Sequence, residues 1–136
     1  MNEFSTAQRF LVAADRRFSA RIRGVRALRG HRVRTETINL TSTAGYQLKA
    51  TIHFPRNTPA SAVLLCPGID DPGSVFTRVQ SPVTADEIAR AGFVAMRFDP
   101  TGRGDSWGEE DYGGPEHQDN VDTALRYLRS RKDVHS

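Results

Sequence analysis

The pattern of apolar residues divides the chain into an arm and a body. From about Thr6 to Leu28, apolar residues recur at steps of three and four, the spacing of one face of an amphipathic helix. This face consists of Phe10, Ala14, Phe18, Ile22 and Val25. Gly30 follows where such a helix ends. We therefore predict a helical arm over residues 1–31 and a body over residues 32–136.

The body opens with the alternating pattern of two β-strands. Residues 33–40 and 47–54 alternate apolar and polar side chains, and Thr43-Ala44-Gly45 between them is typical of a turn. These features predict an antiparallel hairpin. After a loop, residues 62–66 are continuously apolar, as in a strand that a mainly parallel sheet buries on both faces.

Helical and strand patterns then follow in turn. Thr84, with Glu87 three residues later, has the form of a capping box, so a helix begins there or at Ser81-Pro82 and ends at Gly92. The later elements are a strand over residues 93–98, a loop rich in Gly and Asp over residues 99–114, and a helix from Pro115 with apolar residues at Val121, Ala124, Leu125 and Leu128. The order of elements predicts an α/β fold in which an antiparallel hairpin precedes a parallel β-α-β-α unit with right-handed crossovers.

Composition limits the class of protein. The 136 residues fit one domain at most, and 38% apolar with 26% charged residues is typical of a globular protein. No segment approaches the ~20 apolar residues of a membrane span. The start lacks the pattern of a secretory signal, and the lone Cys66 excludes an internal disulfide. We expect a cytoplasmic protein.

Charge is distributed unevenly along the chain. Residues 1–36 contain nine arginines and three acidic residues, a net charge of +6, while the remainder carries −3. The body is therefore not expected to bind nucleic acid. For the basic arm, packing against the body is the most common role of an amphipathic helix. The alternatives are a mitochondrial-type presequence and attachment to a membrane surface or to nucleic acid.

Two segments follow the predicted parallel strands, where such sheets present ligands. They are Leu65-Cys66-Pro67-Gly68-Ile69-Asp70-Asp71-Pro72-Gly73 and Phe98-Asp99-Pro100-Thr101-Gly102-Arg103-Gly104-Asp105-Ser106. With the hairpin, they resemble the α/β-hydrolase superfamily, within it the serine aminopeptidase, X-Pro peptidase and esterase-like branches, over about residues 33–134. The family reads His-Gly-x in the first loop, of which only Gly68 is matched, because Pro67 replaces His. The family pattern D-x-x-G-x-G-x-S in the second loop is matched by Asp99, Gly102, Gly104 and Ser106.

The resemblance implies an oxyanion-stabilising N–H in the first loop. The Ile69 N–H is the first candidate donor and the Asp70 N–H the second, with Gly68 allowing a tight approach to substrate. The alternative is that Pro67-Gly68 only ends a strand. We interpret Asp99, Gly102, Gly104 and Ser106 as structural residues of the second loop.

The nucleophile, acid and base that the family requires are not found. No G-x-S-x-G pentapeptide occurs, so the body is expected to be a partial domain that ends before the nucleophile elbow. Gly104-Asp105-Ser106-Trp107 resembles the nucleophile block of another esterase family, but Asp133-Val134-His135 lacks its D-x-x-H spacing. Pairing of Ser106 with His117 is a weaker alternative.

We therefore predict the amino-terminal portion of a serine hydrolase for a small ester, thioester or amide, without cofactor or metal. The main alternative is an inactive chain, truncated or completed by a partner, and a further one is a targeting arm joined to a hydrolase remnant. The resemblance also implies that the fifth strand of the family's sheet, which lies beside the third, is missing here, so residues 63–66 are expected to form an unpaired apolar sheet edge that favours self-association.

Overall fold

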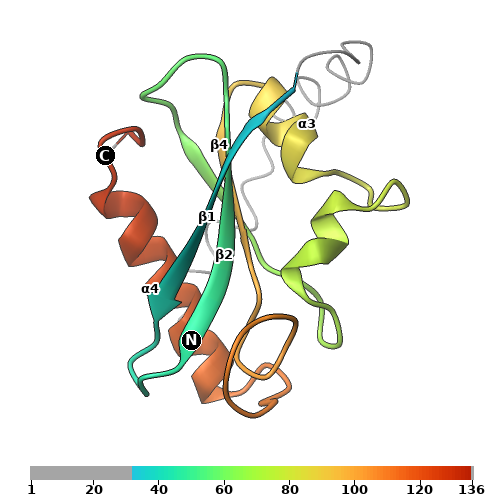
Figure 1. Cartoon of the computed structure of the whole chain (residues 1–136), viewed down its shortest axis with the longest axis vertical. Coiled ribbons are helices and arrows are strands. Elements are labelled where there is room, and N and C mark those ends of the chain that lie inside the picture. Colours follow the sequence, from blue (N-terminus) through green and yellow to red (C-terminus); the bar gives the residue numbers. More distant parts are fainter. Residues whose placement is uncertain (1–31, 136) are drawn as a thin grey trace, which may run out of the picture.

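The computed structural model describes residues 32–135, so the predicted arm lies outside the described residues. Figure 1 shows strands crossed by one long helix, with shorter helical segments beside them. In chain order the elements are β1 (Arg34–Thr41), β2 (Gln47–Phe54), β3 (Ala62–Leu65), the 3₁₀ helix η1 (Gly73–Thr77), α3 (Ala85–Arg90), β4 (Val94–Phe98) and α4 (Pro115–Ser130).

The strands form one mixed sheet in the order β1-β2-β4-β3. The hairpin partners β1 and β2 run antiparallel, as do β2 and β4, whereas β3 and β4 run parallel. The predicted α/β fold class is therefore confirmed. Because β4 lies between β2 and β3, two strands that are consecutive in the chain do not touch in the sheet.

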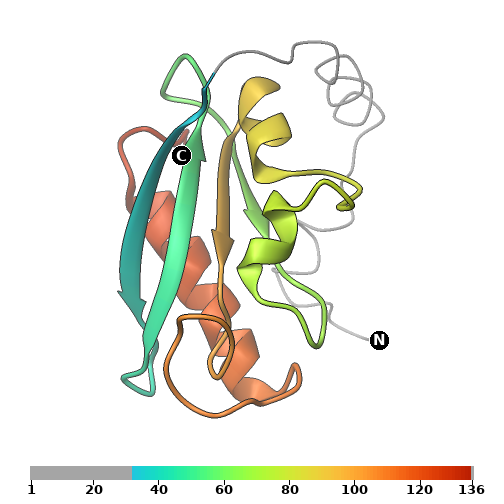
Figure 2. The ribbon, with the colours of Figure 1, turned by 45° about the vertical axis from the view of Figure 1, so that its right-hand side comes forward.

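The two faces of the sheet hold separate apolar clusters. Helix α4 contributes Ala124 and Leu128 to the larger cluster, which also includes Leu48, Ile52 and Met96 from the strands. Helix α3 covers the other face, where its Ala85 and Ile88 pack with Leu65 and Ala95. Figure 2 shows α3 and α4 on opposite sides of the sheet. No helix within residues 32–135 has the length and apolar character needed to cross a membrane.

The boundaries of the elements differ from the sequence predictions in detail. The capping box is present, since Thr84 Oγ1 accepts from the Glu87 N–H and Glu87 Oε2 from the Thr84 N–H, so α3 begins after Thr84 and not at Ser81. Strand β3 ends one residue before Cys66. The helix η1 was not predicted. It begins at Gly73, where a Cβ atom would lie 2.4 Å from the Phe98 carbonyl oxygen, so only glycine fits against β4.

Within residues 32–135, β3 pairs along its length with β4 alone. Its other side is approached by the segment after α4, in which Val134 forms a parallel bridge with Ala60. The Ala60 N–H donates to the Asp133 carbonyl at 3.1 Å, and the His135 N–H donates to the Ala60 carbonyl at 3.0 Å.

A buried histidine joins three elements on the α3 face. His53 of β2 lies 2.7 Å through Nδ1 from Asp86 Oδ1 of α3, and its Nε2 accepts from Arg97 Nε of β4 at 3.2 Å. Since Nε2 is an acceptor, Nδ1 carries the proton and the ring is neutral. Burial lowers the pKa of His53, although the hydrogen bond and charge of Asp86 act in the opposite direction.

We expect the carbon-bound ring protons of His53 to titrate with a midpoint below 6.5 in an NMR pH series. The unfolded chain takes up this proton at higher pH than the folded chain, so acidification through about pH 6.5 should lower the free energy of unfolding. Asp86→Asn removes the charge that favours imidazolium and should lower the midpoint further. Asp122→Asn, an exposed carboxylate on α4, is the control. A His53 midpoint above 6.5 would contradict this interpretation.

Candidate functional site

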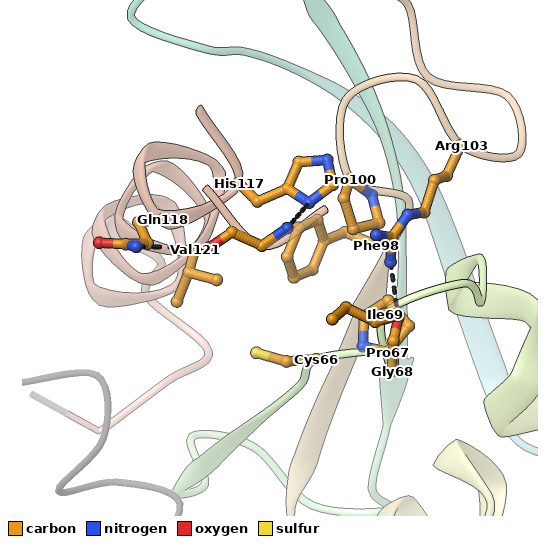
Figure 3. A pocket seen from close by; sticks show the side chains of 11 residues that line it. Cys66, Pro67, Gly68, Ile69, Phe98, Pro100, Arg103, His117, Gln118 and Val121 are labelled. Atoms are coloured by element: carbon orange, nitrogen blue, oxygen red, sulfur yellow. Dashed lines mark hydrogen bonds between the residues drawn. The ribbon is translucent and has the colours of Figure 1, made fainter. Parts of the chain in front are cut away.

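A pocket of about 200 Å³ lies where β3 and β4 end, beside the first turns of α4 (Figure 3). Its lining is largely apolar. The lining residues are Cys66, Pro67, Gly68, Ile69, Phe98, Pro100, Arg103, Gly113, His117, Gln118 and Val121. Parallel strands present ligands at this end of a sheet, so the pocket has the position expected of a binding site.

The loop after β3 provides the backbone donors predicted from the sequence. It turns through a hydrogen bond of 3.2 Å from the Asp71 N–H to the Gly68 carbonyl. Gly68 and Ile69 line the pocket, whereas Asp70 is exposed and lies outside the lining. Among residues 32–135, no acceptor binds the Ile69 N–H or the Asp70 N–H. Two backbone donors are therefore unsatisfied within the described protein, one of them at the pocket.

Asp99 and Ser106 hold the second loop together and do not line the pocket. The buried Asp99 carboxylate accepts from the Gly73 N–H at 2.7 Å and from the Asp105 N–H at 2.9 Å. Ser106 Oγ donates to the Asp99 carbonyl at 2.6 Å and accepts from the Lys49 N–H at 2.8 Å. Asp99 thus connects η1 to the loop, while Ser106 connects the loop to β2.

Gly102 and Gly104 occupy backbone conformations that exclude a side chain. Both have positive φ, 78° and 52°. A Cβ on Gly102 would lie 2.4 Å from the Glu110 backbone nitrogen, and a Cβ on Gly104 would lie 2.3 Å from Asp99 Oδ2. The loop therefore folds back on itself at Gly102 and closes over the Asp99 carboxylate at Gly104.

Arg103, between these glycines, was not identified from the sequence as a site residue. Its side chain is buried and extends from the second loop to the first, as Figure 3 shows. Nη1 donates to the Gly68 carbonyl at 2.6 Å and to the Asp71 carbonyl at 3.3 Å. Nε and Nη2 donate to the two Glu110 oxygens at 2.6 and 2.7 Å. The sequence feature that could have identified Arg103 is an arginine between two loop glycines, followed by the acidic segment 109–111.

Glu110 is held as a carboxylate by its donors. The hydrogen bond from Arg103, followed by that from the Tyr112 N–H, lowers the pKa of Glu110 to about 2. The Tyr112 N–H donates at 2.7 Å, and Tyr112 is a non-glycine residue with positive φ, 48°. Arg103 and Glu110 thus form a neutral pair beside the pocket, so the pocket wall carries little net charge there.

His117 lines the pocket but has no free nitrogen for proton transfer. Its Nδ1 accepts from the Gly113 N–H at 3.0 Å, which leaves Nε2 as the donor to the Thr101 carbonyl at 2.9 Å. Ser106 bonds to Asp99 and Lys49 instead. The alternative pairing of Ser106 with His117 therefore has no hydrogen bond to support it, and the arrangement offers donors without an activated nucleophile. Within residues 32–135, His, Cys, Asp and Glu side chains form no group of three or more that could hold a metal ion.

An L-residue in the left-handed backbone conformation costs about 1–2 kcal/mol. We expect Gly104→Ala to lower the free energy of unfolding by more than this, because the new methyl group also displaces Asp99. Gly45→Ala is the matched control, since Gly45 also has positive φ but has no neighbour within 4 Å of the added Cβ. Denaturant unfolding of both variants measures the difference. Equal losses would show that the contact with Asp99 is unimportant.

No protein-family model matches the chain, and no curated protein is similar to it in sequence. Its structure is similar to that of the hypothetical protein PA2218 from Pseudomonas aeruginosa (19% identity, TM-score 0.55, 78% of this chain and 33% of that one). It is also similar to DcsB, solved with its substrate analogue (16%, 0.62, 76% and 34%). A third similar structure is the α/β hydrolase GrgF from Penicillium sp. sh18 (20%, 0.60, 75% and 34%). The chain spans about a third of each of these proteins, and its described part has the fold of an α/β-hydrolase segment.

Proposed function

We propose that this chain supplies the oxyanion-binding loop of a serine hydrolase that cleaves an ester, thioester or amide bond. The observation that supports the proposal is the Ile69 N–H, which has no acceptor among the described residues and belongs to a residue that lines the pocket. The Asp70 N–H is the second donor candidate. The α/β-hydrolase fold of the similar structures agrees with this function.

Attack on a carbonyl carbon moves negative charge to the carbonyl oxygen. A fixed N–H donor in a site of low polarity stabilises that charge more strongly than water does. Here Ile69 shares the lining of the pocket with apolar side chains such as Phe98 and Val121. The same surroundings favour a small apolar group of the substrate, since a charged group would lose its hydration without gaining a partner.

The remaining catalytic groups must come from outside residues 1–136 in this proposal. No G-x-S-x-G sequence occurs in the chain, and neither Ser106 nor His117 is available for the reaction. The serine, its histidine base and the orienting acid would have to meet the Ile69 N–H at the ends of β3 and β4. Proximity of these groups to one substrate carbonyl is what the reaction requires.

The test uses the protein expressed from the whole reading frame that contains residues 1–136. We expect a fluorophosphonate to label one serine outside these residues and the isolated chain to remain unlabelled. Ile69→Pro removes the N–H and should lower kcat for an activated ester by about 10²–10³-fold, the usual effect of losing one oxyanion donor.

Ile69→Ala is the matched control, because it keeps the N–H and shortens only the exposed side chain. Its kcat should stay within a few-fold of that of the unaltered protein, and circular dichroism should confirm that both variants are folded. Failure to label any serine in the product of the whole reading frame would contradict the proposed function. An unchanged kcat in folded Ile69→Pro would exclude the Ile69 N–H from it.

A second candidate function is a module completed by a partner chain, without activity of its own. The open edge of β3, on the side away from β4, favours this second function. Within residues 32–135, only the bridge between Ala60 and Val134 lies along that edge. Unprotected strand edges recruit other chains. In this case the partner would be a strand from a second copy or from another protein.

We expect the isolated chain to self-associate through this edge, with the sedimentation coefficient rising as the protein concentration increases. Leu64→Lys puts a charge on β3 and should reduce association. Ile38→Lys is the matched control. Ile38 is also partly buried beside the larger cluster, but it belongs to β1, at the opposite edge of the sheet. A monomer at all concentrations, or equal effects of both variants, would contradict association through β3.

A further inference from the structure

We propose that Arg103 is a positioning residue that fixes the direction of the Ile69 N–H by binding the carbonyl of the same peptide group. The inference rests on the proposed function, since it assigns the device that orients the oxyanion donor. Arg103 was not among the residues predicted from the sequence for either loop, so this role is an addition to the proposed function.

The Gly68–Ile69 peptide group is held from one side only. Its carbonyl accepts from Arg103 Nη1 at 2.6 Å and from the Asp71 N–H at 3.2 Å, while its N–H has no acceptor among residues 32–135. A trans peptide is planar, and its C=O and N–H point in opposite directions. Whatever fixes the Gly68 carbonyl therefore fixes the Ile69 N–H as well.

The surrounding loop offers little else to hold this peptide group. Ile69 belongs to no helix or strand, and the residue is 62% exposed. Arg103 binds the carbonyls at both ends of the turn, Gly68 and Asp71, so one guanidinium spans it. Figure 3 shows the Arg103 side chain reaching down to this loop from above.

Arg103 can position the peptide because its own side chain is buried and held by a second set of hydrogen bonds. Its side chain is 6% exposed and makes a forked pair with Glu110, which also accepts from the Asp111 and Tyr112 N–H groups. Such a fork fixes the plane of the guanidinium, which a lysine ammonium cannot reproduce. Since Glu110 balances the charge, the effect of Arg103 on the N–H is mainly geometric.

Order parameters from ¹⁵N relaxation of the isolated chain, recorded at a concentration where sedimentation shows a monomer, test the proposal directly. The Ile69 N–H should have the value of a rigid backbone, about 0.85, and Arg103→Lys should lower it below about 0.6. Arg131→Lys is the matched control, because Arg131 is likewise paired with acidic side chains, those of Glu36 and Asp133, and has no hydrogen bond to the loop. It should leave the Ile69 value unchanged.

A purely structural role of Arg103 would give a different result. If Arg103 only supports the second loop, the Tyr112 N–H should become mobile in Arg103→Lys while the Ile69 N–H stays rigid, and that result would overturn the proposal. Glu110→Gln provides a second variant should Arg103→Lys fail to fold. It removes the charge that holds the guanidinium and should also lower the Ile69 order parameter, and an unchanged value there would equally overturn the proposal.

The activity of the protein from the whole reading frame separates this inference from the proposed function. Arg103→Lys should lower kcat by about 10²-fold with little change in KM, as expected when a catalytic group is misplaced. A labelled serine together with an unchanged Ile69 order parameter would leave the function standing and overturn the role of Arg103. If the Ile69 N–H becomes mobile in Arg103→Lys but the whole protein has no reactive serine, Arg103 positions the peptide group and the proposed function is overturned.

Discussion

Two buried charged side chains determine the shape of the loops beyond the sheet. Most backbone hydrogen bonds of these loops close turns within one loop, so other groups must hold the two loops against each other. The Asp99 carboxylate accepts from η1 and from its own loop, while the Arg103 guanidinium binds the carbonyls of the loop after β3. Both side chains reach from the second loop to residues 68–73, so the arrangement of the two loops around the pocket depends on both.

The sequence was sufficient to predict the elements that depend on contacts between residues close together in the chain. The capping box at Thr84 and the alternation of the hairpin each predicted an element that is present, because the relevant contacts join near neighbours in the chain. Strand order was accessible only through the family resemblance. The helix η1 escaped prediction because Gly73 is placed by Phe98 and Asp99, which lie far away in the sequence.

For the candidate site, the sequence indicated which loop to examine but not what holds it. Gly68, Ile69 and Asp70 were proposed from position after a buried strand, and two of them line the pocket. Arg103 could not be assigned, because its role depends on tertiary contacts with Gly68 and Asp71 that no spacing rule describes. The fold of the similar structures does not decide the reaction, since one fold hosts many functions.

The strand order also bears on how the chain folds as it is synthesised. Strands β2 and β3 leave the ribosome before β4, yet β4 must come to lie between them. At ordinary translation speeds the residues between Leu65 and Val94 take on the order of seconds to emerge, and during that time both strands lack their shared neighbour. The nascent chain must therefore keep β2 and β3 from pairing with each other, or with another polypeptide, until β4 arrives.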